Sequence, residues 1–117
     1  MNTKQKAIAA LAERCTRLIE WSRADGCYVG SAPPLVGQCC HGKSTIEVAT
    51  QLEEIVLDLC EDAVDGKIPV PEAMDAKPYS GKFVVRVSPA LHKTAALKAQ
   101  AREESLNKFV ANAIANA

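Results

Sequence analysis

The chain has 117 residues, of which 48% are hydrophobic and 24% are charged. That length suits one ordinary domain or two very small ones, and the hydrophobic fraction is too high for a disordered chain. No apolar run approaches the roughly 20 residues of a membrane-spanning helix and no signal peptide is recognisable, so we expect a cytoplasmic protein without a membrane partner.

Charge is divided unequally between the two ends of the chain, although the net charge is zero. Residues 1–76 contain 7 Lys and Arg against 12 Asp and Glu, a balance of −5. Residues 77–117 contain 7 against 2, a balance of +5. Such asymmetry indicates two surfaces with different partners, a basic one for a polyanion such as DNA and an acidic one for a basic protein.

The five cysteines predict buried thiols and no metal site. Their number is odd, and cysteines in a chain without an export signal are usually reduced and packed as small hydrophobic residues. The paired spacing typical of structural zinc sites is absent, and Cys39 and Cys40 would point to opposite faces of a strand. His41 and His92 have no obvious partner for nucleophilic catalysis. We therefore expect no metal, no cofactor and no catalytic residue.

The N-terminal half predicts a short helix followed by a small sheet. An alanine-rich helix is expected over residues 3–14, and strands are expected over 17–22 and 27–31. The Asp25-Gly26 pair between them favours a tight hairpin turn, because glycine tolerates a positive φ. A third strand is expected at 38–41, after two prolines that cannot both lie in a central strand.

A long amphipathic helix should follow from Ser44 to Gly66. Its apolar residues recur at steps of three and four, the spacing of one buried face: Ile46, Ala49, Leu52, Ile55, Val56, Leu59 and Ala63. Ser44 and Glu47 predict a capping box, in which the Ser44 hydroxyl accepts from a helical N–H and the Glu47 carboxylate reaches back. A proline-rich segment then predicts a linker.

The C-terminal residues predict one strand and two helices. "KFVVRV" at 82–87 alternates two faces, as a strand does. Ser88 and Pro89 are typical of a helix start, and the first helix should run through Glu104. Ser105 should cap a second helix that continues to the end. The predicted organisation is an N-terminal domain over 1–72, a linker over 73–79 and a C-terminal domain over 80–117.

"GQCCHGKS" at 37–44 fits the G-x-x-x-x-G-K-[ST] pattern of a phosphate-cradling loop. Such a loop must follow a buried parallel strand and open a helix. Ser44 opens a helix, but "APPLV" cannot be a central parallel strand, and the chain lacks the alternating strands and helices of a parallel sheet. We interpret the pattern as accidental.

A lone strand with two helices cannot pair its own backbone or cover both faces, whereas two copies can if their strands pair antiparallel. The residues expected to form the shared core are Phe83, Val85, Val87, Leu91, Leu97, Leu106, Phe109 and Val110. The opposite strand face would then form a ribbon suited to a DNA major groove, and the start of the last helix could hold a phosphate. The expected DNA-binding residues are Lys82, Val84, Arg86, Ser105, Leu106 and Asn107.

This layout resembles the ribbon-helix-helix family of dimeric DNA-binding proteins, through "RVSPALH" and "SLNKFV". One departure is the turn "REES", which lacks the usual glycine, so Glu103 or Glu104 should be strained or the helix should end differently. An alternative is that the two helices pack onto the N-terminal domain and the strand face is only solvated.

The N-terminal part resembles the HicB family of antitoxins. The matching features are "IEW", "DGCYV", "PPLVGQCCHGKS" and an acidic amphipathic helix, followed by the ribbon-helix-helix tail. The resemblance spans about residues 15–115. It implies an α+β protein: a partial RNase H-like domain, with a three-stranded antiparallel sheet and a packed helix, followed by a ribbon-helix-helix module that dimerises. It implies no nuclease activity.

Our hypothesis is therefore an antitoxin of a HicA/HicB-type pair that binds a small basic ribonuclease toxin and represses its own operon. The expected partners are a second copy, operator DNA and the HicA-like toxin; whether dimers pair into tetramers stays open. The toxin-contacting residues are unknown, and the acidic face with Glu47, Glu54, Asp58 and Glu61 is only one place to look. The alternatives are a stand-alone repressor without a toxin, an enzyme of phosphate-loop or RNase H-like type, and a plain dimerisation module.

Overall fold

The computed structural model describes residues 2–71 and 78–117 of the chain. These divide into two compact units, Met1–Pro78 and Tyr79–Ala117. Of the linker expected at 73–79, all but Pro78 and Tyr79 lies outside the described residues. None of the described helices combines the length and the apolar character that crossing a bilayer requires.

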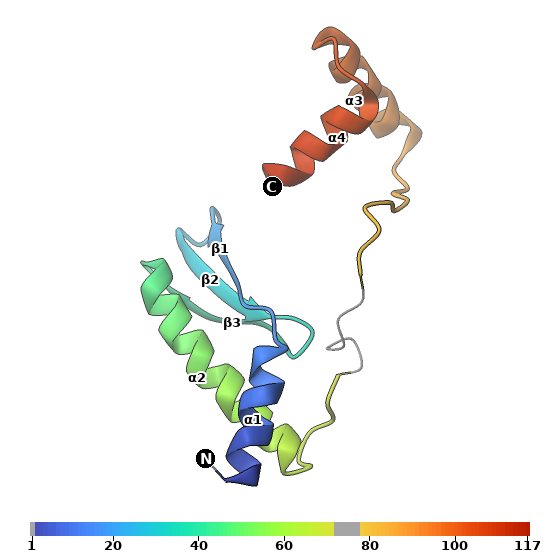
Figure 1. Ribbon diagram of the computed structural model, residues 1–117. Helices are drawn as coiled ribbons and strands as arrows, with labels where there is room; N and C mark the ends of the chain where they lie inside the picture. The colour runs from blue at the N-terminus through green and yellow to red at the C-terminus, as the bar shows by residue number, and fades with distance from the viewer. Residues whose placement is uncertain (1, 72–77) are drawn as a thin grey trace. The chain divides into compact units, whose positions relative to one another are not determined.

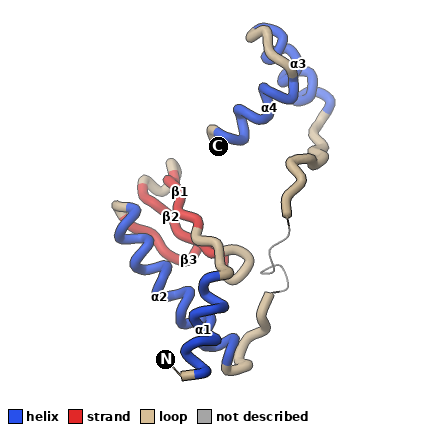
Figure 2. Tube along the Cα trace, viewed as in Figure 1, coloured by secondary structure: helices blue, strands red, loops and turns tan. Residues whose placement is uncertain are grey.

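The first unit contains a three-stranded antiparallel sheet in the order β1-β2-β3 (Figures 1 and 2). The strands are β1 (Leu18–Ser22), β2 (Cys27–Ala32) and β3 (Val36–Gly42). Gly26 in the first hairpin has a φ of 65°, and its N–H donates to the Ser22 carbonyl at 2.8 Å. The first two strands are confirmed. The third is longer than predicted, because Val36 already pairs with Ala32 across the short proline turn.

The long helix α2 (Thr45–Val64) packs against this sheet and supplies most of the core. Leu52, Val48, Val56 and Cys60 are its fully buried side chains. Gly30 at the centre of the sheet lets the helix approach closely, because a Cβ there would lie only 2.7 Å from Val48 Cγ1. The predicted helix is confirmed, and Leu52, Val56 and Ala63 of its predicted face are buried. Ile46 and Ala49 at its start are exposed instead, because Val48 faces the sheet in this turn, and Cys60 joins the buried face.

Hydrogen bonds at both ends of α2 mark where the helix begins and where it ends. Ser44 Oγ accepts from the Glu47 N–H at 3.1 Å, as predicted. The return bond of the capping box differs: Glu47 Oε2 accepts from the N–H of Lys43 at 3.1 Å, rather than from that of Ser44. At the other end, Gly66 adopts a φ of 76° and Lys67 N–H donates to the Asp62 carbonyl at 2.8 Å, which is the Schellman arrangement.

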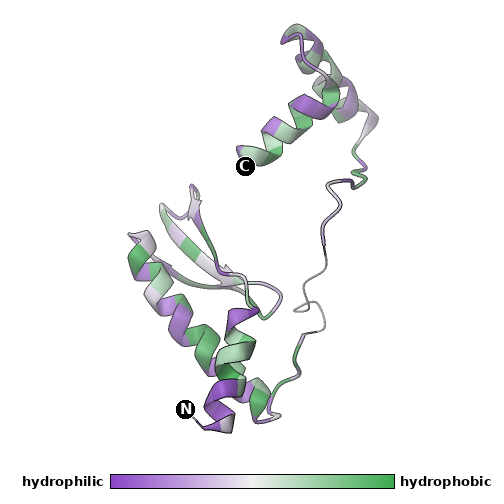
Figure 3. Ribbon diagram, in the orientation of Figure 1, coloured by the Kyte–Doolittle hydropathy of each residue, from purple (hydrophilic) through white to green (hydrophobic). Residues whose placement is uncertain are grey.

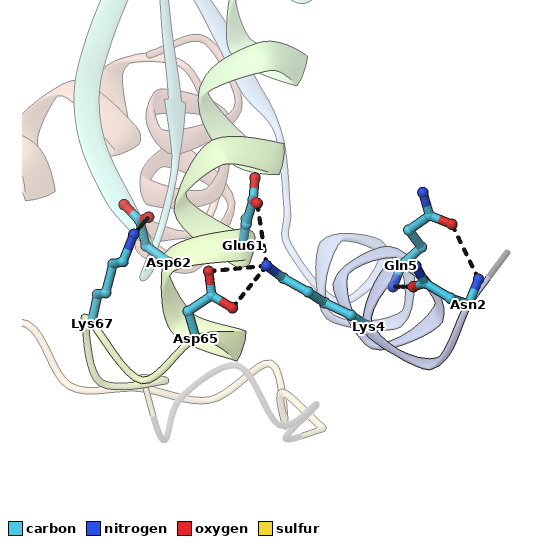
Figure 4. Close-up of polar contacts among 7 residues, drawn as sticks. All are labelled: Asn2, Lys4, Gln5, Glu61, Asp62, Asp65 and Lys67. Atoms are coloured by element: carbon cyan, nitrogen blue, oxygen red, sulfur yellow. Dashed lines mark hydrogen bonds and ion pairs between the residues drawn. The ribbon is translucent and has the colours of Figure 1, made fainter.

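The helix α1 (Thr3–Glu13) packs against α2 and belongs to the core of this unit. Leu11 and Ala12 are buried in the same cluster as α2. Lys4 Nζ lies 2.9 Å from Asp65 Oδ1 and 3.5 Å from Glu61 Oε1 (Figure 4). The hydrogen bond to Asp65 raises the pKa of Lys4. The first residues of the chain therefore hold the C-terminal end of α2.

The second unit consists of α3 (Pro89–Ala101) and α4 (Leu106–Ala115), preceded by a segment without regular structure. Ser88 Oγ accepts from Leu91 N–H at 3.1 Å with Pro89 in the first turn, and Ser105 Oγ accepts from Lys108 N–H at 3.1 Å. Both predicted helix starts are confirmed. The strand predicted at 82–87 is not formed within this chain, because the segment has no neighbouring strand to pair with (Figure 2).

The first of these helices ends three residues earlier than predicted, through the strained turn that the sequence indicated. Glu103 has a φ of 54°. Its N–H donates to the Gln100 carbonyl and that of Glu104 to the Ala99 carbonyl, again a Schellman arrangement. A glutamate thus occupies the left-handed position where a glycine is usual.

Candidate functional site

The second unit has almost no core of its own. Ala99 is the only residue classed as buried among those described in Tyr79–Ala117. The aliphatic and aromatic side chains expected in a dimer core are largely solvent-exposed, with Phe83 at 71% and Val85 at 60%. Units of about 40 residues rarely fold without a partner, disulfide or metal. This unit therefore presents an uncovered apolar surface.

The uncovered side chains gather along two hollows between the extended segment and the helices. Val85, Leu106 and Val110 line both. Phe83 and Ile114 line the first, while Val87 and Leu91 line the second, which measures about 650 Å³. Figure 3 shows apolar residues in the segment before α3 and along α4. The structure thus brings most of the predicted core residues to one surface.

Two of the predicted core residues do not line the hollows, and one residue that does was not predicted. Leu97 lines neither hollow, and Phe109 contacts the guanidinium of Arg102, whose Cζ lies 5.2 Å from the ring centroid. Ile114 was not predicted, although its spacing of four residues from Val110 on the same helix could have indicated it.

The residues predicted to bind DNA are all at least partly accessible in the second unit. Lys82, Val84 and Arg86 are exposed, Val84 at 87%. Val84 lines neither hollow, whereas its neighbours Phe83 and Val85 do. Lys82 and Arg86, predicted to share the face of Val84, line the first and the second hollow respectively. The single chain therefore does not show the full alternation expected of a strand with one apolar and one free face.

The start of α4 is open and lacks acidic residues in its first turn. Ser105 caps it through Lys108 N–H, so the hydroxyl is already engaged, while no hydrogen bond within the described residues is recorded for the N–H groups of Leu106 and Asn107. Unpaired N–H groups at a helix start can donate hydrogen bonds to an anion. Arg102, three residues before Ser105, was not among the predicted DNA-binding residues; its guanidinium lies over the Phe109 ring.

The residues that match the phosphate-loop pattern do not form a loop. Gly37 and Gly42 both lie within β3, so the stretch between them is an extended strand. The helix start that follows is occupied by the chain's own carboxylate, because Glu47 Oε2 accepts from Lys43 N–H. A Cβ on Gly42 would lie 2.8 Å from the Glu47 carboxyl carbon. This geometry cannot cradle a phosphate group.

The five cysteines are free thiols in the first unit; Cys15, Cys40 and Cys60 are buried as predicted, whereas Cys27 and Cys39 are only partly buried. Cys40 Sγ lies 3.9 Å from the Val48 carbonyl of α2 and Cys39 Sγ lies 3.7 Å from the Gly30 carbonyl. Burial, and then the neighbouring Cys40, raise the pKa of the Cys39 thiol. Burial, followed by the nearby Cys15, raises the pKa of Cys60 to about 11. No group of three potential metal ligands comes together in residues 2–71 or 78–117.

The acidic face of α2 is only partly neutralised. Glu61 is paired with Lys4, and Glu47 caps the helix start. Arg17 forms a pair with Glu53 at 3.1 Å. Glu54 and Asp58, both exposed, have no ion pair or hydrogen bond within the described residues. Of the four predicted acids, two thus stay available to a partner.

Comparison with known proteins gives one match. Residues 69–114 match the model of the HicB family. The match covers less than half of the chain and supports a HicB-family relationship for this part. It covers the second unit and the residues just before it, whereas the helix and sheet of the first unit lie outside it. No curated protein and no solved structure matches the chain significantly.

Proposed function

We propose that the chain is the antitoxin of a HicA/HicB-like toxin–antitoxin pair, which binds a small ribonuclease toxin and represses its own operon as a ribbon-helix-helix dimer. One observation carries the proposal. The unit that matches the HicB family is also the unit whose apolar residues are left uncovered in a single chain.

A second copy would pair the backbone of residues 82–87 and cover the exposed apolar side chains of this unit. Antiparallel pairing of residues 82–87 with their equivalents would satisfy the backbone groups of 83–87, which have no hydrogen bond to any other described residue. The helices of the second copy would fill the hollows lined by Val85, Leu106 and Val110. Burial of these side chains would contribute roughly 1.5–3 kcal/mol for each that is fully covered.

The paired segment would present Lys82, Val84 and Arg86 twice on its outer face. A two-stranded ribbon fits the major groove, where Arg86 would read a guanine through two hydrogen bonds. The start of α4 would hold a backbone phosphate and fix the register. The charge supports this role, because Tyr79–Ala117 contains six Lys and Arg against two Glu.

The first unit would cover the toxin. Its three-stranded antiparallel sheet with α2 packed against it is compatible with a partial RNase H-like domain, and it carries the acidic half of the charge. Opposite charge would speed the capture of a basic toxin and discriminate between partners.

The proposal is tested by producing the chain together with a HicA-like toxin. We expect a stoichiometric complex, relief of toxin-induced growth arrest, and binding of the chain's own promoter DNA. A chain that ends at Pro78 should stay folded, bind the toxin and lose DNA binding. A chain that neither binds nor neutralises such a toxin would remove the antitoxin function.

The second candidate is a stand-alone ribbon-helix-helix repressor without a toxin. The restriction of the family match to residues 69–114 favours it, because the first unit then needs no antitoxin function. Promoter binding by a chain that fails to bind any HicA-like toxin would identify this alternative.

A further inference from the structure

The exposed side of α2 combines aliphatic side chains with free negative charge. Ile46, Thr50 and Leu57 follow one another at helical spacing, and Glu54 and Asp58 lie on the adjacent row. Ile46 is 77% exposed and Leu57 is 40% exposed. These five residues are referred to below as the α2 outer face.

The two kinds of side chain meet at a shallow hollow. Ile46, Ala49, Thr50, Glu53 and Glu54 line a depression of about 560 Å³. An exposed isoleucine at the rim of a depression offers an anchoring point that an ordinary solvated acidic helix does not have.

All charged side chains of α2 are negative, and the ion pairs that neutralise some of them do not include those of the α2 outer face. The helix contains six Asp and Glu and no Lys or Arg. The cations that reach it from elsewhere are Lys4, Arg17 and Lys67, and they pair with Glu61, Glu53 and Asp62. Glu54 and Asp58 have no such partner within the described residues.

We propose that the α2 outer face is the surface on which the basic toxin docks, with Ile46 and Leu57 against aliphatic side chains and Glu54 and Asp58 against lysines or arginines of the toxin. This inference rests on the proposed function and specifies its partner-binding surface. Charge complementarity selects a basic protein, because a nucleic acid would be repelled by a helix without a single cation.

The experiment uses the full chain and the purified HicA-like toxin as the probe. The first variant combines Glu54→Gln with Asp58→Asn, and its control combines Glu13→Gln with Glu20→Gln. All four residues are exposed, and both variants remove two negative charges from the same unit. At low salt the first variant should associate about tenfold more slowly, and the difference should shrink at high salt. The control should associate at nearly the wild-type rate.

A second pair of variants tests the apolar contact. Ile46→Ser should dissociate about tenfold faster from the toxin, because the anchoring side chain is lost. Val70→Ser removes another exposed aliphatic side chain, 45% exposed against 77% for Ile46, beyond the end of α2, and should leave the dissociation rate unchanged. Thermal melting of each variant alone verifies that the fold is retained.

The outcomes separate this inference from the proposed function. If the wild-type chain binds the toxin and all four variants bind it equally well, the docking surface lies elsewhere and the antitoxin function stands. If the wild-type chain does not bind the toxin, both are overturned. If the α2 variants instead change only the association between copies of this chain, the face serves the basic unit of another copy and the inference is wrong.

Discussion

The approach of α2 to the sheet gives the most quantitative prediction, the substitution Gly30→Ala. The added Cβ would lie 2.7 Å from Val48 Cγ1 and 2.8 Å from Cys40 Sγ, whereas 3.4–4 Å is ordinary contact. Val48 is fully buried and β-branched, so it cannot rotate away and the helix must move instead.

The expected cost follows from two opposing effects. Overpacking a core by one carbon costs roughly 1–3 kcal/mol. Restricting the unfolded chain by replacing glycine with alanine returns about 0.4–1 kcal/mol. We therefore expect Gly30→Ala to lower the free energy of unfolding by about 1–2 kcal/mol and the Tm by roughly 5–15 °C.

Gly37→Ala is the matched control, since it lies in β3 with no atom within 4 Å of its added Cβ. It should be neutral or slightly stabilising. Trp21, the only tryptophan, lies in β1 and reports unfolding of the first unit within the full chain. Urea titration followed by its fluorescence measures both variants. Equal stability of Gly30→Ala and wild type would refute the close packing of α2 on the sheet.

Three further predictions concern the second unit and the thiols. Arg86→Ala should weaken binding to the operator by about 1–3 kcal/mol in fluorescence anisotropy, and unchanged affinity would remove this residue from the DNA interface. Glu103→Gly should raise the stability of the second unit by about 1 kcal/mol, because it relieves a φ of 54°; a lower melting temperature at equal protein concentration would contradict this. Because the pKa of Cys60 is raised from 9.0 to about 11, the folded state keeps a proton that the unfolded state loses. The contribution of Cys60 to stability should therefore be fully present below pH 9 and be lost as the pH rises through 11. The slope of unfolding free energy against pH in that range should be smaller in Cys60→Ala, and identical slopes would assign the effect to other groups.

Local patterns were sufficient to predict most elements of the fold. The step of three and four residues identified the middle of the buried face of α2, Leu52 and Val56, but included the exposed Ile46 and missed Val48 and Cys60. Ser44, Ser88 and Ser105 marked helix starts because their hydroxyls cap free N–H groups. Gly26 indicated its turn because few other residues accept a φ of 65°.

The remaining features depend on contacts that are distant in the sequence. The packing of α1 on α2 was not predicted, since Glu61 and Asp65, the partners of Lys4, lie 57 and 61 residues further along the chain. The return bond of Glu47 goes to Lys43 rather than Ser44 because the strand–helix junction directs it there. The strand at 82–87 is absent because a strand needs a neighbour, and a single chain supplies none to this segment. The DNA-binding assignment of Lys82 and Arg86 remains a prediction.

The pairing of α1 with the far end of α2 has a consequence for folding during synthesis. Lys4 leaves the ribosome 61 residues before Asp65, to which it is bound in the folded unit. At about 5–20 residues per second, this interval lasts roughly 3–12 s. During most of it, before α2 begins to emerge at Thr45, Leu11 and Ala12 have no helix to bury them. The pairing of Lys4 with Asp65 therefore forms only when α2 is complete, and shorter nascent chains expose the apolar side chains of α1 to any chaperone or protease nearby.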